Sequence, residues 1–198
     1  MFTVLLHERC FLAVEGPTEE QTFPQLFRLV MGKPMQSAGI ALISGGGNDG
    51  ALKVTEFLIK HNRAVIFIVD KDSAGKKVFS LEKLHSHGVT DGQIHFIGAP
   101  NELEELYSNN QWAETLNAEW PRSDGLIWTE NDIAALRDRG KFSDELKRVI
   151  WKGAKEGPSK QEMNMKLVLR LRTADEVPEQ LREKFYAVAS LASGDVGT

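Results

Sequence analysis

Four short apolar runs, separated by stretches with apolar residues at helical spacing, dominate the first hundred residues of the chain. The third run, residues 64–69, is uninterrupted and rich in β-branched residues, which is typical of a strand buried on both faces. The predicted strands cover residues 11–14, 40–43, 64–69 and 94–97. Strands that alternate with helices predict an α/β fold with an open, mostly parallel four-stranded sheet.

Capping signals predict where the first helix begins. Gly16-Pro17 ends the first strand, and Thr18-Glu19-Glu20-Gln21 has the form of a capping box with Thr18 as the N-cap. Apolar residues at helical spacing follow as far as Val30. The pattern therefore predicts a helix directly after the first strand.

Three further turn or capping signals divide the rest of the first half. The glycine-rich loop at 44–50 is expected to open a second helix, and a polar helix is expected from about 76 to 86. Asn101 is expected to cap a short helix that carries Glu102 and Glu104. The glycine triplet lacks the lysine of a P-loop, so nucleotide binding is not the favoured interpretation.

Helical periodicity extends through the second half of the chain. Apolar residues near 133–136, 146–150, 167–171 and 181–191 predict four amphipathic helices. We therefore expect an α/β domain over residues 1–115 and a helical C-terminal extension over 116–198 that packs on it. Four tryptophans can stack on bases, but packing in a core or an interface is the favoured interpretation for each: Trp112, Trp120, Trp128 and Trp151.

The composition is that of a soluble globular protein, with 41% apolar and 26% charged residues among 198. No apolar run is long enough to span a bilayer. Residues 1–10 contain His7, Glu8 and Arg9 and make a poor secretory signal, and Cys10 is the single cysteine. These features predict a cytoplasmic protein without disulfides or membrane contact.

Charge is distributed unevenly along the chain. The net charge of −4 argues against bulk coating of nucleic acid. Residues 130–172 hold eleven Lys and Arg against seven Asp and Glu, a balance of +4, so the remainder carries −8. A metal-dependent enzyme acting on a polyanion would show this division, although solvated helix faces produce it equally well.

Acidic residues follow three of the four predicted strands. Glu15 follows the first strand, Asp70 and Asp72 follow the third, and a Glu-rich segment at 102–105 follows the fourth. The carboxyl ends of parallel strands lie along one edge of a sheet, where ligands bind. Carboxylates without a Cys or His ligand set suit Mg²⁺ or Mn²⁺ and do not suit Zn²⁺. Helix capping by the aspartates, compensation of a helix dipole by Glu19 and a solvated run at 102–105 are the simpler alternatives.

The order of these motifs resembles a Toprim domain. Glu-Gly-Pro-Thr-Glu from Glu15, the glycine-rich loop, Asp70-x-Asp72 and Glu102-Leu-Glu-Glu-Leu-Tyr107 are most similar to the Toprim regions of OLD (overcoming lysogenisation defect) nucleases. The similarity is strongest over residues 10–110. It implies a Toprim-like, Rossmann-like sheet, nuclease activity and a role in phage defence.

The resemblance also implies roles for individual residues. Glu15 and Glu19 would ligate metal or activate water, and Asp70 and Asp72 would hold metal. Glu104 is the best match for the family's later acid, with Glu102 next and Glu105 still open. The family's lysine at the scissile phosphate best matches Lys160, with Lys152 as the rival.

The resulting hypothesis is a Mg²⁺- or Mn²⁺-dependent endonuclease that cuts or nicks DNA by a two-metal mechanism. OLD proteins carry an ATPase region ahead of the Toprim part, whereas this sequence has no Walker lysine motif and only about ten residues before the first strand. We therefore expect any ATP control to come from a separate chain or to be absent. The alternatives are a metal- and nucleic-acid-binding subunit that needs such an ATPase partner, and an RNA-processing nuclease. For the helical extension, packing on the sheet, formation of a homodimer face and a cover over the substrate groove are the alternatives.

Overall fold

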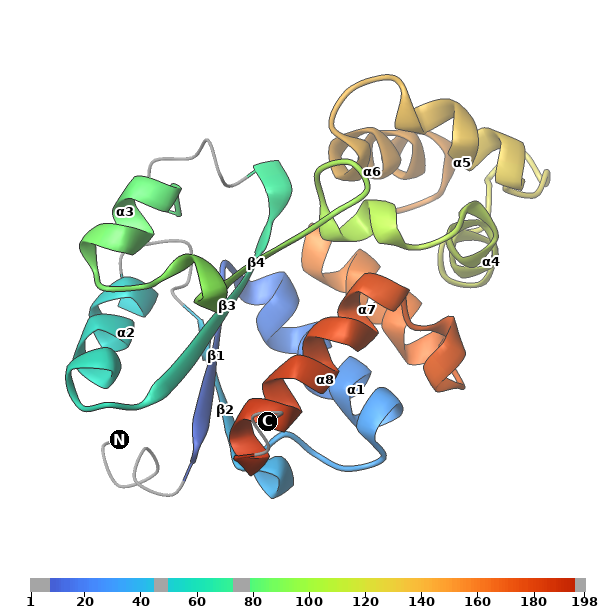
Figure 1. Ribbon diagram of the computed structural model, residues 1–198. Coiled ribbons are helices and arrows are strands. Elements are labelled where there is room, and N and C mark those ends of the chain that lie inside the picture. Colours follow the sequence, from blue (N-terminus) through green and yellow to red (C-terminus); the bar gives the residue numbers. More distant parts are fainter. Residues whose placement is uncertain (1–7, 45–49, 73–78, 195–198) are drawn as a thin grey trace.

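The computed structural model describes residues 8–44, 50–72 and 79–194, and all structural statements below concern these residues. A twisted parallel sheet forms the middle layer, with helices on both faces and a further group of helices beyond one face (Figure 1). The strands are β1 (Cys10–Val14), β2 (Ile40–Ser44), β3 (Ala64–Asp70) and β4 (Ile94–Ile97). The predicted α/β fold with four parallel strands is confirmed.

The strand order β2-β1-β3-β4 places the two most apolar strands in the centre. The register pairs Val14 of β1 with Ser44 of β2 and with Ile68 of β3, and pairs Asp70 of β3 with Ile97 of β4. All four strands therefore end at the same edge. β1 and β3 are buried along almost their full lengths because helices cover both faces.

Helices of 6 to 15 residues make up most of the rest of the described chain. They are α1 (Pro17–Met31), α2 (Gly50–Lys60), α3 (Leu81–Ser86), α4 (Asn109–Glu119), α5 (Glu130–Arg137), α6 (Phe142–Gly153), α7 (Lys160–Arg170) and α8 (Glu179–Ser193). Short 3-10 helices are η2 (Gln36–Ala38), η4 (Asp91–Gln93), η5 (Leu103–Leu106) and η6 (Ala174–Glu176).

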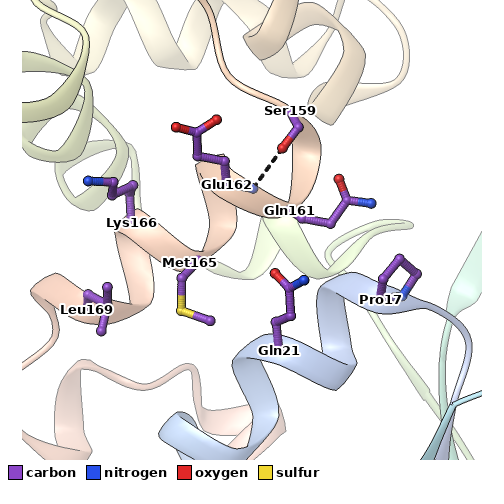
Figure 2. A pocket seen from close by; sticks show the side chains of 8 residues that line it. All are labelled: Pro17, Gln21, Ser159, Gln161, Glu162, Met165, Lys166 and Leu169. Carbon is purple, nitrogen blue, oxygen red and sulfur yellow. Dashed lines mark hydrogen bonds between the residues drawn. The ribbon is translucent and has the colours of Figure 1, made fainter.

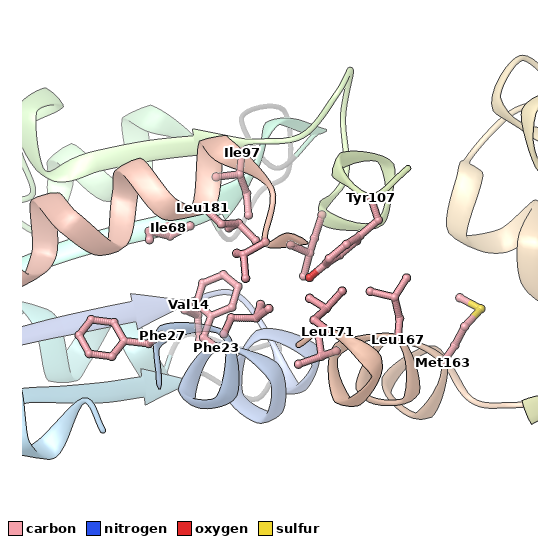
Figure 3. Packing of buried hydrophobic residues seen from close by; sticks show 14 of the residues in the cluster. Val14, Phe23, Phe27, Ile68, Ile97, Tyr107, Met163, Leu167, Leu171 and Leu181 are labelled. Carbon is pink, nitrogen blue, oxygen red and sulfur yellow. The ribbon is translucent and has the colours of Figure 1, made fainter. Parts of the chain in front are cut away.

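Two hydrophobic clusters lie on opposite faces of the sheet. The smaller cluster packs Phe11 and Phe67 against α2 and α3. The larger cluster packs the other face of β1 and β3 against α1 and α8 and continues among the helices α4 to α7. Phe185 of α8 meets Phe23 and Phe27 of α1 edge to face, with ring centroids 5.4 and 5.7 Å apart. Figure 3 shows this core extending from Phe27 beside the sheet to Met163 of α7.

The predicted helices in the second half are present as α5, α6, α7 and α8. α7 packs closely on α1 and also contacts α4, so it joins the α4–α6 group to the sheet (Figure 1). α8 contacts all four strands. The boundary at residue 115 between a sheet domain and a helical extension stays a prediction.

Several predicted helix starts differ from the structure. α1 is capped by Gly16 rather than Thr18, because Glu19 at the third helical position accepts a hydrogen bond from the Gly16 N–H (3.1 Å). Residues 79 and 80 are not helical and α3 begins at Leu81, where Ser80 Oγ accepts from the Lys83 N–H. Glu102, not Asn101, caps the short helix η5. The glycine triplet lies outside the described residues.

The turn after β4 returns the chain toward β3. Gly98 has φ +130°, and a Cβ there would lie 2.4 Å from the carbonyl carbon of Asn101. Only glycine fits such a conformation and so close an approach. The Asp72 N–H donates to the Asn101 carbonyl oxygen (3.3 Å), so this turn sets 101–104 against the end of β3.

Candidate metal centre

Asp70 is the last residue of β3 and lies at the centre of the acidic edge. Its side chain is only 6% exposed, and its Oδ1 accepts a hydrogen bond from the Leu103 N–H (2.9 Å). Burial raises the pKa of Asp70 to about 9, and the negative charges of Glu19 and Glu104 act in the same direction. A rigid strand thus holds a carboxyl group that strongly favours a compensating cation.

Glu15 and Glu19 approach Asp70 from the junction of β1 and α1. Glu19 is buried in the first turn of α1, where Gly16 fixes one carboxylate oxygen. Burial raises the pKa of Glu19 to about 7, and the charges of Glu104 and Glu15 add to this rise. The half-buried Glu15 also raises the pKa of Asp70. Both predicted acids therefore lie within electrostatic reach of Asp70.

Glu102 and Glu104 complete a compact group with Asp70. One carboxylate oxygen from each of the three residues lies within 4.8 Å of the others. Glu104 is fully buried, and burial raises its pKa although Lys160 opposes the rise. Asp70 at the end of β3 and two glutamates from the segment after β4 thus place their carboxylate oxygens close enough together to ligate one cation.

Glu102 is held in its charged form by different contacts. Burial opposes its ionisation, but the Ser143 backbone N–H and hydroxyl donate to the two carboxylate oxygens at 3.1 and 2.8 Å. These hydrogen bonds and the charges of Lys160 and Lys141 lower the pKa of Glu102. Neighbouring acids in this group therefore have pKa values shifted in opposite directions.

Two lysines supply positive charge to the acids. Lys160 Nζ lies 3.1 Å from Glu104 Oε1 and 3.4 Å from Glu102 Oε1. Lys141 Nζ lies 3.0 Å from Glu102 Oε1 and 3.3 Å from Asp72 Oδ2. Burial lowers the pKa of Lys160, but the surrounding carboxylates outweigh it and raise that pKa above its usual value. Lys160 therefore remains charged at neutral pH.

Other sequence candidates lie at the margin. Asp72 is partly exposed two residues beyond the end of β3 and contacts Lys141, outside the group of three. Glu105 Oε2 accepts from the N–H groups of Asn101 and Glu102 at 2.6 and 2.7 Å, which makes it a backbone cap. Lys152 is exposed in the last turn of α6, and its charge acts on Glu145 rather than on the site.

Three contributors were not predicted from the sequence: Lys141, Ser143 and Asn164. Asn164 Nδ2 donates to Glu104 Oε1 at 2.8 Å. Asn164 lies one helical turn after Lys160, so this spacing offered a signal once Lys160 had been chosen. Lys141 and Ser143 come from the start of α6, which tertiary packing alone brings to Glu102.

The acidic group passes a test of fit for a cation. Glu104 Oε2 and Asn164 Oδ1 are buried and have no hydrogen-bond partner within the described part of the chain. Buried oxygen atoms rarely stay unpaired, so they are suited to bind a further group. The donors are oxygen atoms throughout, which suits a hard divalent cation. The group Asp70, Glu102 and Glu104 can therefore hold a metal ion.

A shallow groove of about 450 Å³ lies between α1 and α7. The three acids of the candidate metal centre do not line it. Figure 2 shows Gln21 and Pro17 of α1 facing Gln161 and Met165 of α7 across it. Residues two apart on a helix point in nearly opposite directions, so α1 presents Gln21 here and Glu19 to the metal centre. The groove is therefore separate from the acidic edge.

None of the helices in the described ranges has the length and apolar character required to cross a bilayer. Comparison with curated proteins gives no match. Residues 6–72 match the family model for the overcoming lysogenization defect protein-like Toprim domain. This segment includes β1, β2, β3, Glu15, Glu19 and Asp70.

Solved structures extend the comparison to most of the chain. The C-terminal region of the Xanthomonas campestris pv. campestris OLD protein is similar with a TM-score of 0.62 and 17% identity, over 97% of each chain. The C-terminal region of the Burkholderia pseudomallei OLD protein is similar with a TM-score of 0.59 and 16% identity, over 92% of this chain and 98% of that one. At such identities these likenesses establish the fold, including its helical part. Residues 6–72 thus match the OLD-like Toprim model and the chain has the fold of the OLD C-terminal regions, in agreement with the resemblance drawn from its sequence.

Proposed function

We propose that this protein hydrolyses phosphodiester bonds in DNA with the help of Mg²⁺ or Mn²⁺. The observation that carries the proposal is the convergence of Asp70, Glu102 and Glu104 within 4.8 Å, next to the charged Lys160. Buried carboxylates in such numbers need cations, and metal-dependent phosphoryl chemistry needs that arrangement. The OLD-like Toprim fold supports the same reading.

The acids form two groups, each of which is a candidate for binding one cation. Asp70, Glu102 and Glu104 would hold one cation, and Glu15, Glu19 and Asp72 are the candidates for a second. A pair of divalent cations would supply charge stabilisation at the attacking and leaving oxygens of the phosphodiester. The proposal names Mg²⁺ or Mn²⁺ because all the donors are oxygen atoms.

Glu19 and Lys160 have properties beyond ligation. With a pKa near 7, a carboxylate oxygen of Glu19 can accept a proton from a water molecule at neutral pH. Lys160 lies in the first turn of α7, and its positively charged ammonium group can move from Glu104 toward a bound phosphate oxygen. These two groups are the proposed proton acceptor and phosphate ligand.

The test is incubation of purified protein with supercoiled and linear DNA plus Mg²⁺ or Mn²⁺. Wild-type protein should yield nicked or linear product, and Asp70→Asn should lower the rate by more than about 100-fold because metal ligands act as a unit. Glu130→Gln, an exposed acid in the first turn of α5, is the matched control and should cleave normally. Equal activity of Asp70→Asn would rule the proposal out.

A second candidate is a metal- and nucleic-acid-binding subunit that cuts only with a separate ATPase chain. The similar solved structures favour this candidate, because they are C-terminal regions of OLD proteins. This candidate predicts binding without cleavage when the protein is alone, and cleavage after mixing with an ATPase partner. Running RNA beside DNA in both assays tests the RNA-processing alternative.

A further inference from the structure

Trp151 differs from the other three tryptophans of the chain. Trp112, Trp120 and Trp128 are buried, whereas Trp151 in the last turn of α6 is 58% exposed. A single exposed apolar side chain is common on protein surfaces, so this ring is set apart by how it is held and by the charges around it. We propose that Trp151 is a stacking platform for an unpaired base of the nucleic-acid substrate.

The indole is fixed rather than free to rotate. Its Nε1–H donates to the Pro158 carbonyl oxygen at 3.2 Å. A Cβ on Gly157 would lie 2.4 to 2.6 Å from three atoms of the five-membered ring, so the Gly157 backbone covers one face of the indole. The fixed ring therefore loses little conformational entropy when a base stacks on its open side.

Positive charge around the ring identifies the partner as a polyanion. Lys147 lies one helical turn before Trp151, Lys152 follows it, and Lys155 lies between it and Pro158, all three exposed. Residues 144–160 hold five Lys and Arg against three Asp and Glu. Arg148 is paired with Glu145, and Lys160 is paired with the acids of the metal centre, which leaves these three lysines against Asp144 and Glu156. An aromatic ring among lysines is the usual arrangement in proteins that bind single strands.

The platform is connected directly to the metal centre. Pro158, which holds the indole, is two residues before Lys160, and Lys160 contacts Glu102 and Glu104. At about 3.5 Å per residue, the indole nitrogen lies within roughly 10 Å of the Lys160 backbone. The inference rests on the proposed function and specifies its substrate: nucleic acid with unpaired bases beside the scissile phosphate.

Binding can be measured without cleavage. The probes are a fluorescently labelled single-stranded oligonucleotide and the matching duplex, titrated by anisotropy in EDTA and again in Ca²⁺. Wild-type protein should bind the single strand more tightly than the duplex. Trp151→Ala should weaken single-strand binding by about 5-fold to 150-fold, and Trp151→Phe by less than about threefold, because phenylalanine keeps a stacking surface.

Tyr186→Ala is the control, since Tyr186 is a 52% exposed aromatic residue on a different helix, α8. It should leave binding unchanged, and circular dichroism should show that all variants are folded. Quenching of tryptophan fluorescence by the oligonucleotide should disappear in Trp151→Phe while binding persists.

The outcomes separate this inference from the nuclease proposal. Loss of single-strand affinity in Trp151→Ala supports the platform even if no cleavage is seen with any metal. Unchanged affinity in folded Trp151→Ala, or no single-strand binding by the wild type in either EDTA or Ca²⁺, overturns the platform even if duplex DNA is cut.

Discussion

The side-chain amide of Asn164 lies 2.8 Å from Oε1 of Glu104, and both residues are almost completely buried. This hydrogen bond and Lys160 are the contacts that compensate a carboxylate whose other oxygen is unpaired in the described structure. The α7 helix therefore stabilises the acidic edge as well as packing on α1.

Replacement of Asn164 by alanine should lower the free energy of unfolding by about 1 to 3 kcal/mol. The reason is that it removes the amide that donates to the buried Glu104 carboxylate and leaves Lys160 to compensate that carboxylate. Asn110→Ala is the matched control, since Asn110 also donates to a glutamate one turn away, Glu114, but at the surface. It should change stability by less than about 0.5 kcal/mol. Urea unfolding measures both, and equal effects would contradict the structural role of Asn164.

Divalent cations should stabilise the fold. Besides burial, the charges of Glu19 and Glu104 raise the pKa of Asp70, and the charge of Glu104 raises the pKa of Glu19, so repulsion among these acids destabilises the metal-free protein. A cation present at 100 times its Kd adds about 2.7 kcal/mol. For a chain of this length that corresponds to a rise in Tm of roughly 5 to 10 °C. Thermal melts with Mn²⁺ or EDTA at matched ionic strength measure the shift, which Asp70→Asn should reduce to near zero.

The stability of the metal-free protein should fall as pH rises. The pKa values of Glu19 and Asp70 are raised in the folded state to about 7 and about 9, from ordinary values of 4.5 and 3.8. The folded state then binds more protons than the unfolded state between about pH 4 and pH 9, so this stability is complete at low pH and is lost across that window.

Metal binding should show the opposite dependence on pH, because carboxylates must lose protons to ligate. Melts in EDTA and in Mn²⁺ at pH 6 and pH 8.5 separate the two effects. The shift in Tm caused by Mn²⁺ should be larger at pH 8.5. A shift that is the same at both pH values would show that Glu19 and Asp70 do not titrate in this range.

The two candidate lysines should behave differently when each is replaced by methionine. Lys160→Met should lower the maximal cleavage rate by at least about 100-fold, since Lys160 contacts the acidic group. Lys152→Met should raise the DNA concentration needed for half-maximal rate and leave the maximal rate near normal. Rates measured over a range of DNA concentrations distinguish kcat from KM. The reverse pattern would transfer the phosphate role to Lys152.

The Gly98 turn can be tested with a second glycine as its control. Gly98→Ala should cost about 3 kcal/mol or more, because the new Cβ would meet backbone atoms of Asn101. Gly125 also has a positive φ of +78° but has open space around its Cα, so Gly125→Ala should cost only about 1 kcal/mol. Equal losses in urea unfolding would show that Gly98 is needed for its φ alone.

Much of the fold could be predicted from the sequence. The strands were predicted to within one residue, and for β1 and β3 the reason is that a parallel strand buried on both faces is an unbroken apolar run. Helix starts were less reliable. The Thr18 capping box is a valid local signal, but Gly16 and Glu19 form the competing cap two residues earlier. Local sequence alone does not decide between two overlapping caps.

The candidate site could be predicted only in part. Strand ends converge by topology, so Glu15, Asp70 and the acids at 102–104 could be placed together from the strand pattern. Lys141 and Ser143 could not, because they reach Glu102 through the packing of α6 on the rest of the chain.

Lys160 and Glu102 are 58 positions apart, yet their side chains form one ionic group. A chimera that takes its α7 helix from a relative would therefore need a lysine at position 160 and an asparagine at position 164. Without them, the buried carboxylate of Glu104 would have neither its ion-pair partner nor its hydrogen-bond donor. Substitutions in the segment after β4 and in α7 are therefore expected to depend on one another.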